Sequence, residues 1–425
     1  MPKFAFITFG CKVNQYEGQG LRENLQERGY SEVDAQSPAD LYILNTCTVT
    51  ETASKEATKL AKKLHKKNPS AKITITGCAA ETHRKVFMEL AGVQSVINHE
   101  DKHQLPQLIQ TGSNPYPETT IRKRAKIRDE NIFEIGISRF DNHTRAFVKV
   151  EDGCDLCCSF CIIPKVRGGP TSRALPPIIE EAKRLIGNGY REIVLTGVHL
   201  GAYGKDLNGK INISHLVEEL LTLPLDRIRL SSLEANEIDD HLIDLMAAEP
   251  GRFCPHLHLP LQSGDTQILR AMRRRYNPKQ FLEACEKVAK RVPNPSFTTD
   301  VIVGFPGETE AQFENSINIC RKVGMSRIHI FPYSPRTGTD AALLPETISP
   351  IEKKARLHRL KAEAKIMTRK YAEKFIGKEV SVLWEKDGGY TERYLQARLP
   401  GKPNELIRAR VTSVKNGELI CERIP

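Results

Sequence analysis

Short apolar runs alternate with amphipathic helical stretches in the first quarter of the chain. Three of the runs are KFAFITF, DLYILN and KITITG, and each has the length and the β-branched or aromatic content of a buried strand. Helical spacing follows each run, for instance in ETASKEATKLAKKLHKK from Glu51. This alternation predicts a parallel sheet flanked by helices. We therefore expect an N-terminal parallel α/β domain over residues 1–112.

A second alternation runs from about residue 145 to residue 334. Its expected strands are AFVKV, EIVLTG, RIRLSS, HLHLPL, TTDVIVG and RIHIFPY, with helix-like segments such as PPIIEEAKRLIGNG between them. Six strand–helix repeats fall short of a closed eight-stranded barrel, so the pattern predicts an open, partial (β/α)6 barrel. We expect it over residues 139–368, after a basic linker over 113–138. Its active-site residues should lie at the carboxyl ends of the strands.

The pattern of charged and apolar residues changes in the last part of the chain. Residues 351–378 hold ten Lys or Arg against three Asp or Glu in a helical pattern. The short runs EVSVLWE, LIRARVTSV and GELICERI follow, separated by turn residues. They predict a small β-barrel over 369–425, of a kind often used to hold nucleic acid. The fold class is thus a multidomain α/β protein with a C-terminal β-barrel.

Composition and charge limit the kinds of partner that this protein is expected to have. Across 425 residues, 63 Lys and Arg outnumber 52 Asp and Glu, which gives a net charge of +11 and a pI near 9.0. This excess favours a polyanionic partner, although basic surfaces often serve only solubility. The N-terminus has no leader pattern and no apolar run reaches the roughly 20 residues that span a bilayer, so we expect no membrane partner and a cytoplasmic location. We also expect a monomer.

Eleven cysteines in a long chain of this kind argue for metal ligation or redox chemistry rather than a disulfide scaffold. The strongest local motif is EDGCDLCCSFCIIP, in which Cys154, Cys158 and Cys161 form a C-x3-C-x2-C triad directly after the strand AFVKV. Three thiolates on one loop suit a cubane iron–sulfur cluster with one open iron. The alternative is a zinc site that also uses the adjacent Cys157.

Three further cysteines share a placement. Cys11, Cys47 and Cys78 each occupy the turn after a predicted parallel strand of the N-terminal domain. Because such turns converge along one edge of a parallel sheet, the three thiols could close a second site. The alternative is that all three are small, buried turn residues. The remaining cysteines show no common placement, and Cys285 and Cys320 fit helical packing positions.

Polar residues also stand at the ends of the predicted barrel strands. They either cap the helices that follow or line a ligand pocket, and several on one rim favour the pocket. The residues are Thr196 and His199 after the second barrel strand, Ser231, Ser232 and Glu234 after the third, Gln262 and Ser263 after the fourth, and Asp300 in the fifth.

These motifs together resemble the radical S-adenosylmethionine methylthiotransferase family over essentially the whole chain. GCDLCCSFCIIP resembles the cluster loop of the family, and FGCKVNQYE, NTCTVT and GCAAE resemble its three N-terminal cysteine motifs. RLSSLE, HLPLQSG and DVIVGFPGET resemble its barrel signatures, and the C-terminal segment resembles its OB-like, RNA-binding TRAM barrel. Cys157 departs from the pattern, because an aromatic residue is common there, and a swap of ligands stays open.

The resemblance implies two 4Fe–4S clusters and S-adenosylmethionine as cofactors. A cluster on Cys154, Cys158 and Cys161 would bind S-adenosylmethionine and release a 5′-deoxyadenosyl radical that abstracts hydrogen from the substrate. A cluster on Cys11, Cys47 and Cys78 would hold the sulfur that is methylated and transferred. S-adenosylmethionine would contact residues of the barrel rim, namely Thr196, Gly197, Ser231, Glu234, Gln262 and Asp300.

The substrate expectation rests on short motifs and on charge. GCKVNQYE and NTCTVT resemble the branch that modifies N6-threonylcarbamoyladenosine beside the tRNA anticodon, rather than the isopentenyladenosine branch or the ribosomal-protein aspartate branch. Basic runs could contact the phosphates of the anticodon stem-loop, or could be solvated faces. The candidates are Arg122, Lys123, Arg124, Arg273, Arg274, Arg275, Lys353, Lys354 and Arg356.

Two other functions would account for part of these motifs. A non-catalytic iron–sulfur protein that binds RNA and senses redox state would need the cysteines and the charge but not six strand–helix units with polar rims. A different radical enzyme would use the second cluster only to relay electrons. An enzyme of the methylthiotransferase kind would also need a flavodoxin-like or ferredoxin-like electron donor and a sulfur source, which the sequence does not identify.

Overall fold

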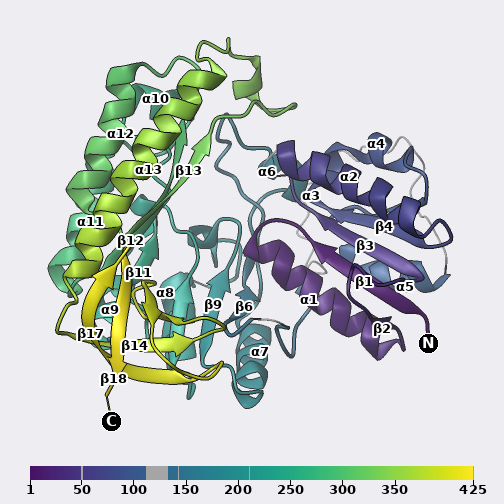
Figure 1. Ribbon diagram of the computed structural model, residues 1–425, viewed down its shortest axis with the longest axis horizontal. Helices are drawn as coiled ribbons and strands as arrows, with labels where there is room; N and C mark the ends of the chain where they lie inside the picture. The colour runs from purple at the N-terminus through teal and green to yellow at the C-terminus, as the bar shows by residue number, and fades with distance from the viewer. Residues whose placement is uncertain (49–50, 112–132, 142, 210, 425) are drawn as a thin grey trace.

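In the computed structural model, which describes residues 1–48, 51–111, 133–141, 143–209 and 211–424, the chain begins with a parallel sheet (Figure 1). All strand pairings are parallel, in the order β2-β1-β3-β4-β5. The strands are β1 (Lys3–Thr8), β2 (Ser31–Glu32), β3 (Leu41–Thr46), β4 (Lys72–Gly77) and β5 (Val93–Val96). The predicted parallel domain is confirmed, with two short strands, β2 and β5, added at its edges.

Helices cover both faces of this sheet because its strands are apolar on both sides. Tyr42 and Leu44 of β3 pack toward α2 (Glu51–Lys67), α3 (Cys78–Thr82) and α4 (Arg84–Met88). Ile43 points the other way, toward α1 (Lys12–Glu27) and α5 (Leu105–Thr111). Continuous apolar strands are what a sheet buried on both faces requires.

Six parallel strands form the central partial barrel, as predicted. They lie in two three-stranded sheets, β6-β9-β10 and β11-β12-β13, which parallel bridges from β10 to the β11 region connect. The strands are β6 (Ala146–Lys149), β9 (Glu192–Thr196), β10 (Arg227–Leu230), β11 (His256–His258), β12 (Ser296–Val303) and β13 (Arg327–Pro332). The connecting helices include α7 (Leu175–Gly187), α8 (Ile213–Leu221), α9 (Asp240–Ala248), α10 (Thr266–Ala271), α11 (Pro278–Arg291) and α12 (Glu310–Val323). Cys285 and Cys320 are buried on α11 and α12, as packing residues.

A closed barrel ends the chain. The basic helix α13 (Pro350–Glu373) leads into it, and its strand order is β14-β15-β16-β18-β17. The predicted runs form β14 (Glu379–Trp384), β17 (Leu406–Lys415) and β18 (Glu418–Arg423), whereas β15 (Gly389–Thr391) and β16 (Gln396–Arg398) are too short for the pattern to reveal. Within the described ranges, no helix has both the length and the apolar character needed to cross a bilayer.

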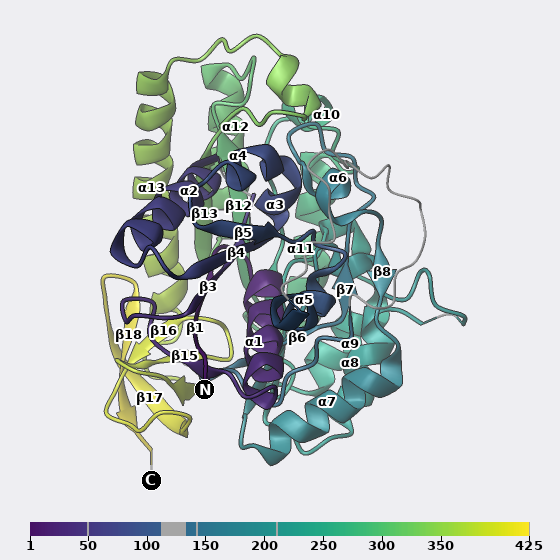
Figure 2. The same ribbon diagram turned by 90° about the vertical axis from the view of Figure 1, so that its right-hand side faces the viewer.

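Helix α1 lies along β6, so the N-terminal domain covers one edge of the partial barrel (Figures 1 and 2). Of the segment expected to be a linker, residues 133–138 are described. Ile135 packs with the N-terminal cluster that contains Leu21, and Ile137 packs in the barrel core. These two residues therefore connect the cores of the two domains.

Buried arginines attach the C-terminal barrel to the amino-terminal end of the partial barrel. Arg229 Nε lies 2.6 Å from Glu192 Oε1, and Arg227 Nη1 lies 3.4 Å from Glu192 Oε2. The same guanidinium groups donate to C-terminal carbonyls: Arg227 to Tyr390 O at 3.1 Å, and Arg229 to Thr391 O at 3.2 Å. Glu192 is therefore the counter-charge of both anchoring arginines.

We predict that Glu192→Gln destabilises the C-terminal barrel by about 3–5 kcal/mol, because removal of one partner leaves buried charge uncompensated. Trp384 on β14 is the single tryptophan, so its fluorescence during urea unfolding reports this domain. Glu180→Gln is the matched control, because the Glu180–Lys183 pair is exposed and its loss should change the unfolding free energy by less than about 0.5 kcal/mol. Equal unfolding midpoints for the two variants would contradict the prediction.

The same pair predicts a dependence on pH. Burial alone raises the pKa of Glu192, but Arg229, Arg145 and Arg227 bring it down from 4.5 to about 2. A carboxyl with a depressed pKa in the folded state stabilises fully above its unfolded pKa and loses that contribution as the pH falls. Between pH 4.5 and 2, the Trp384 unfolding midpoint of the wild-type protein should fall more steeply than that of Glu192→Gln. Parallel profiles would exclude this role for Glu192.

Candidate functional site

The C-x3-C-x2-C motif forms a loop between β7 (Glu151–Asp152) and α6 (Ile163–Arg167). Backbone bonds hold it: Cys154 N donates to Gly168 O at 3.0 Å, and Cys161 N donates to Cys158 O at 3.0 Å. Burial raises the pKa of Cys161 to about 11, and the nearby charge of Cys158 adds to the rise. Burial likewise raises the pKa of Cys154, with added contributions from Cys161 and Cys158. The three predicted thiols therefore converge.

Cys157 differs from its neighbours. It is exposed, whereas Cys154 and Cys158 are buried. Its φ of 45° is one that residues other than glycine rarely adopt. A four-cysteine zinc site needs Cys157 to join the other three, so this geometry favours the three-thiol set.

The three N-terminal cysteines stand at the carboxyl ends of the adjacent strands β1, β3 and β4. Cys11 precedes α1, Cys47 follows β3, and Cys78 begins α3. A Cβ atom on Gly10 would lie 2.4 Å from Cys47 Sγ, so Gly10 and its neighbour Cys11 lie against Cys47. Burial raises the pKa of Cys78, and the charge of Cys11 contributes to the rise. The sheet therefore places these three cysteines along one edge, at the ends of neighbouring strands.

Helix α6 connects the two cysteine sets. It begins two residues after Cys161, and Ile162 and Val166 pack directly against Cys78. On the other side, Arg336 after β13 donates to Thr48 Oγ1 at 3.0 Å, beside Cys47, and its charge acts to lower the pKa of Cys161. The two thiol sets therefore belong to one continuous site between the N-terminal domain and the barrel mouth.

One arginine contacts each set of thiols. Arg167 Nε donates to Cys78 Sγ at 3.2 Å, and Arg274 Nη1 donates to Cys158 Sγ at 3.2 Å. A guanidinium beside a thiol stabilises the thiolate, which is the form that binds metal. No pattern in the sequence predicts either contact. The only signal for Arg167 is its place at the end of the short helix that follows the cysteine motif.

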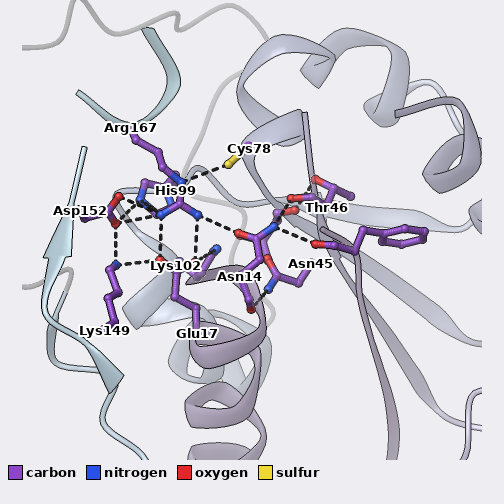
Figure 3. Close-up of polar contacts among 12 residues, drawn as sticks. Asn14, Glu17, Asn45, Thr46, Cys78, His99, Lys102, Lys149, Asp152 and Arg167 are labelled. Atoms are coloured by element: carbon purple, nitrogen blue, oxygen red, sulfur yellow. Dashed lines mark hydrogen bonds and ion pairs between the residues drawn. The ribbon is translucent and has the colours of Figure 1, made fainter. Parts of the chain in front are cut away.

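A buried ionic network lies behind Cys78 (Figure 3). Ligand atoms of Glu17, His99 and Asp152 lie within 4.8 Å of one another, a spacing that suits a metal ion, but protein cations fill this position. Lys149 Nζ lies 2.7 Å from Glu17 and 2.5 Å from Asp152, and Arg167 Nη1 bonds both carboxylates. Burial lowers the pKa of His99 to about 4, so this imidazole is neutral. The network is therefore structural.

The predicted rim residues do gather at the barrel mouth. Thr196, Ser231 and Gln262 lie at the carboxyl ends of neighbouring strands, and Gln262 N donates to Asp300 O at 2.8 Å. Asp300 lies within β12, 3.3 Å from His258 Nε2. The hydroxyl of Ser231 is buried and has no hydrogen-bond partner among the described residues. This orphaned donor fits a mouth that receives a polar ligand.

Two further rim residues have other partners. A Cβ atom on Gly197 would lie 2.6 Å from Glu151 Oε2, so only glycine allows this close approach. Burial raises the pKa of Glu151 well above its usual value, and Glu151 Oε1 has no bond partner in the described part of the chain. Glu234 instead pairs with Arg274, the arginine that contacts Cys158. Glu234 thus orients a group beside the thiols, and Glu151 is a rim residue that the sequence analysis missed.

The basic residues expected to contact RNA divide into three groups. Arg122, Lys123 and Arg124 lie outside the described residues. The side chains of Arg274, Lys353 and Arg356 are buried, and they pair with Glu234, Glu346 and Glu308 respectively. For these three the expectation of a surface contact is wrong, because amphipathic packing of α13 and of the Arg273–Arg275 turn directs them inward. Arg273, Arg275 and Lys354 are exposed.

Two family models match the chain. "Uncharacterized protein family UPF0004" matches residues 3–98, and "Radical SAM superfamily" matches residues 148–320. The threonylcarbamoyladenosine tRNA methylthiotransferase MtaB of Bacillus subtilis is 36% identical over 414 residues, which cover 94% of this chain and 91% of that protein. The chain belongs to the radical SAM methylthiotransferase family. The predicted resemblance is confirmed.

Other similar proteins agree with this assignment. The tRNA-2-methylthio-N(6)-dimethylallyladenosine synthase of Aquifex aeolicus is 36% identical over 414 residues, covering 95% of this chain and 94% of that protein. Among solved structures, the radical S-adenosylmethionine methyltransferase TsrM from Kitasatospora setae is similar with a TM-score of 0.57 at 14% identity, over 80% of this chain and 77% of that chain. The likeness to TsrM concerns the fold alone.

We predict that Gly10→Ala opens the N-terminal cysteine site. Its φ of +94° disfavours any side chain, and the added Cβ would overlap Cys47 Sγ. Cys47, which is buried, should become reactive toward a thiol alkylating reagent, as peptide mass spectrometry would detect. Gly29→Ala is the matched control, since Gly29 has a φ of +85° but no atom within 4 Å of an added Cβ. Equal alkylation of Cys47 in both variants would count against the contact.

Proposed function

We propose that this protein methylthiolates C2 of N6-threonylcarbamoyladenosine next to the anticodon of tRNA, giving 2-methylthio-N6-threonylcarbamoyladenosine. The observation that carries the proposal is the pair of three-thiol sets joined by α6 at the mouth of a radical SAM barrel. Methylthiolation of an unactivated carbon needs a radical step and a sulfur-transfer step. Two separate sets of ligands next to one barrel mouth supply one location for each.

The donor atoms fit the cofactors of this family. Cys154, Cys158 and Cys161 would hold one 4Fe–4S cluster, and Cys11, Cys47 and Cys78 would hold the second, because thiolates are the usual ligands of such clusters. When bound, the clusters and S-adenosylmethionine would supply the one-electron cleavage, the sulfur and its methyl group. Ser231 and Glu151 have buried polar atoms with no partner among the described residues, so they suit the polar groups of S-adenosylmethionine.

The substrate branch rests on the cysteine motifs. GCKVNQYE and NTCTVT resemble the motifs of the branch that modifies N6-threonylcarbamoyladenosine, and the relative from Bacillus subtilis carries that substrate in its name. The alternative substrate is isopentenyladenosine, because the tRNA-2-methylthio-N(6)-dimethylallyladenosine synthase of Aquifex aeolicus is also 36% identical to this chain. A ribosomal-protein aspartate is a further alternative within the family, and an RNA-binding redox sensor is the alternative outside it.

Charge supports tRNA as the partner. The net charge of +11 favours a phosphate backbone, and exposed arginines are available on β17, where Arg408 and Arg410 pair with the exposed Glu379. Exposed pairs of this kind are weak, so phosphates can displace them. Arg273 and Arg275 lie beside the first cysteine loop, since Arg275 donates to Asp155 O at 2.9 Å. An electron donor and a sulfur source complete the set of partners.

We predict opposite effects of removing one thiol from each set. Cys158→Ala should abolish the formation of 5′-deoxyadenosine, because the radical step depends on the first set. Cys11→Ala should retain 5′-deoxyadenosine and lose the methylthiolated nucleoside. The assay uses anaerobically reconstituted protein, S-adenosylmethionine, a reductant and tRNA that carries threonylcarbamoyladenosine, with both products measured by mass spectrometry.

Each alternative gives a different result in this assay. A redox sensor would form no 5′-deoxyadenosine, and a relay enzyme would form no methylthiolated nucleoside with wild-type protein. Cys254→Ala is the matched control, because Cys254 is buried beside Arg229 and Glu192 at the other end of the barrel, so its replacement should leave both products unchanged. Full product formation by Cys11→Ala would refute the second cluster.

A further inference from the structure

Arg167 is the most densely bonded side chain behind the N-terminal cysteines (Figure 3). Its side chain is 1% exposed. Nε donates to Cys78 Sγ at 3.2 Å, Nη1 donates to both oxygens of Asp152 at 2.9 Å, and Nη2 donates to Asn14 Oδ1 at 2.7 Å. Glu17 accepts from Nη1 at 3.1 Å and from Nη2 at 3.3 Å. A planar fork with five N–H groups is the only side chain that can serve all of these partners.

Through Asn14, the same arginine reaches the other two cysteine loops. Asn14 Nδ2 donates to Phe9 O at 3.0 Å and to Thr46 O at 2.8 Å. Phe9 lies two residues before Cys11, and Thr46 directly precedes Cys47. Since the Asn14 amide nitrogen holds these two loops, its oxygen is left for Arg167. One guanidinium therefore contacts the third cysteine directly and the loops of the first two through one intermediary.

The positive charge of Arg167 is buried beside the third cysteine. Its guanidinium bonds the carboxylates of Glu17 and Asp152 as well as Cys78 Sγ. In a buried site a positive charge stabilises nearby negative charge more strongly than it does in water. Arg167 is therefore placed to stabilise an anionic group at Cys78.

We propose that Arg167 is a positioning residue for the iron–sulfur site on Cys11, Cys47 and Cys78, where it orients the three cysteine loops and raises the reduction potential of the site. This inference rests on the proposed function, because it presumes a cluster on these cysteines. Hydrogen bonds to ligand sulfurs and nearby positive charge both stabilise the more negative, reduced state of an iron–sulfur site. Arg167 supplies both from a helix that begins beside the other cysteine set.

The test examines the N-terminal cluster in the absence of the other cluster. Cys154, Cys158 and Cys161 are replaced by alanine in the full chain, which leaves only the N-terminal site for anaerobic reconstitution. In this background, Arg167→Gln is compared with the parent by iron and sulfide content and by redox titration followed with electron paramagnetic resonance. Glutamine keeps hydrogen-bond donors at this position, so the fold should persist. At the midpoint potential of the parent, the ratio of reduced to oxidised cluster should fall about tenfold.

Arg274→Gln is the matched control in the same background. Arg274 lies beside the other cysteine set and pairs with Glu234, so its replacement removes a buried arginine without changing the bonds of Arg167. It should leave the potential of the N-terminal cluster unchanged. If Arg167→Gln does not fold, Arg167→Lys decides the question, because a lysine keeps the charge but cannot bond Cys78, Asn14 and the carboxylates together. Its cluster should then show a lower potential or a lower iron content than the parent.

The outcomes separate the two proposals. A folded Arg167→Gln protein with parental iron content and parental midpoint potential would overturn the role of Arg167 while leaving the proposed function intact. Equal shifts with Arg274→Gln would overturn it too, since the effect would not be specific to this site. Loss of iron from folded Arg167→Gln alone would support it through the positioning of the loops. Absence of any cluster in the alanine parent would refute the second cluster, and with it both the proposed function and this inference.

Discussion

Glu17 on α1 is a carboxylate buried at the boundary between two domains, and it accepts from Lys102 of its own domain and from Lys149 and Arg167 of the barrel. Burial alone raises the pKa of Glu17, but Arg167, Lys102 and Lys149 bring it well below its usual value. Removal of one partner from such a set strands a buried charge, whereas the complete set is satisfied in one geometry. The N-terminal domain is therefore seated on the barrel in a single orientation, and that orientation is what brings the two cysteine sets together.

The two ends of the partial barrel have different roles. At the carboxyl ends of the strands lie the thiols, the unpartnered Ser231 and Glu151, and the arginines that contact sulfur. At the amino-terminal ends, Arg227, Arg229 and Glu192 hold the C-terminal barrel. The C-terminal barrel is thus attached at the ends of the strands that lie opposite to the thiols.

Much of this arrangement could be predicted from local patterns. Apolar runs indicate the strands, and the rule that parallel strand ends converge predicts that Cys11, Cys47 and Cys78 lie along one edge of the sheet. The cysteine spacing identified the loop at Cys154 in the same way. These features can be predicted because each depends on residues close in sequence or on one repeated strand direction.

The remainder depends on contacts that no local pattern encodes. Arg167 lies 150 residues from Glu17 and 89 residues from Cys78, so neither partner can be inferred from its neighbours. Arg274 stands between two exposed arginines and points inward to Glu234 and Cys158, although the run RRR indicated a surface for phosphates. Strands β15 and β16 have three residues each, and barrel closure rather than periodicity creates them.

The most direct test of the account is nucleoside mass spectrometry of tRNA from cells with and without the gene for this protein. We predict that 2-methylthio-N6-threonylcarbamoyladenosine disappears without the gene, that N6-threonylcarbamoyladenosine accumulates in its place, and that the wild-type gene restores the product. Unchanged 2-methylthio-N6-threonylcarbamoyladenosine, or loss of the methylthiolated isopentenyladenosine instead, would contradict the proposed function.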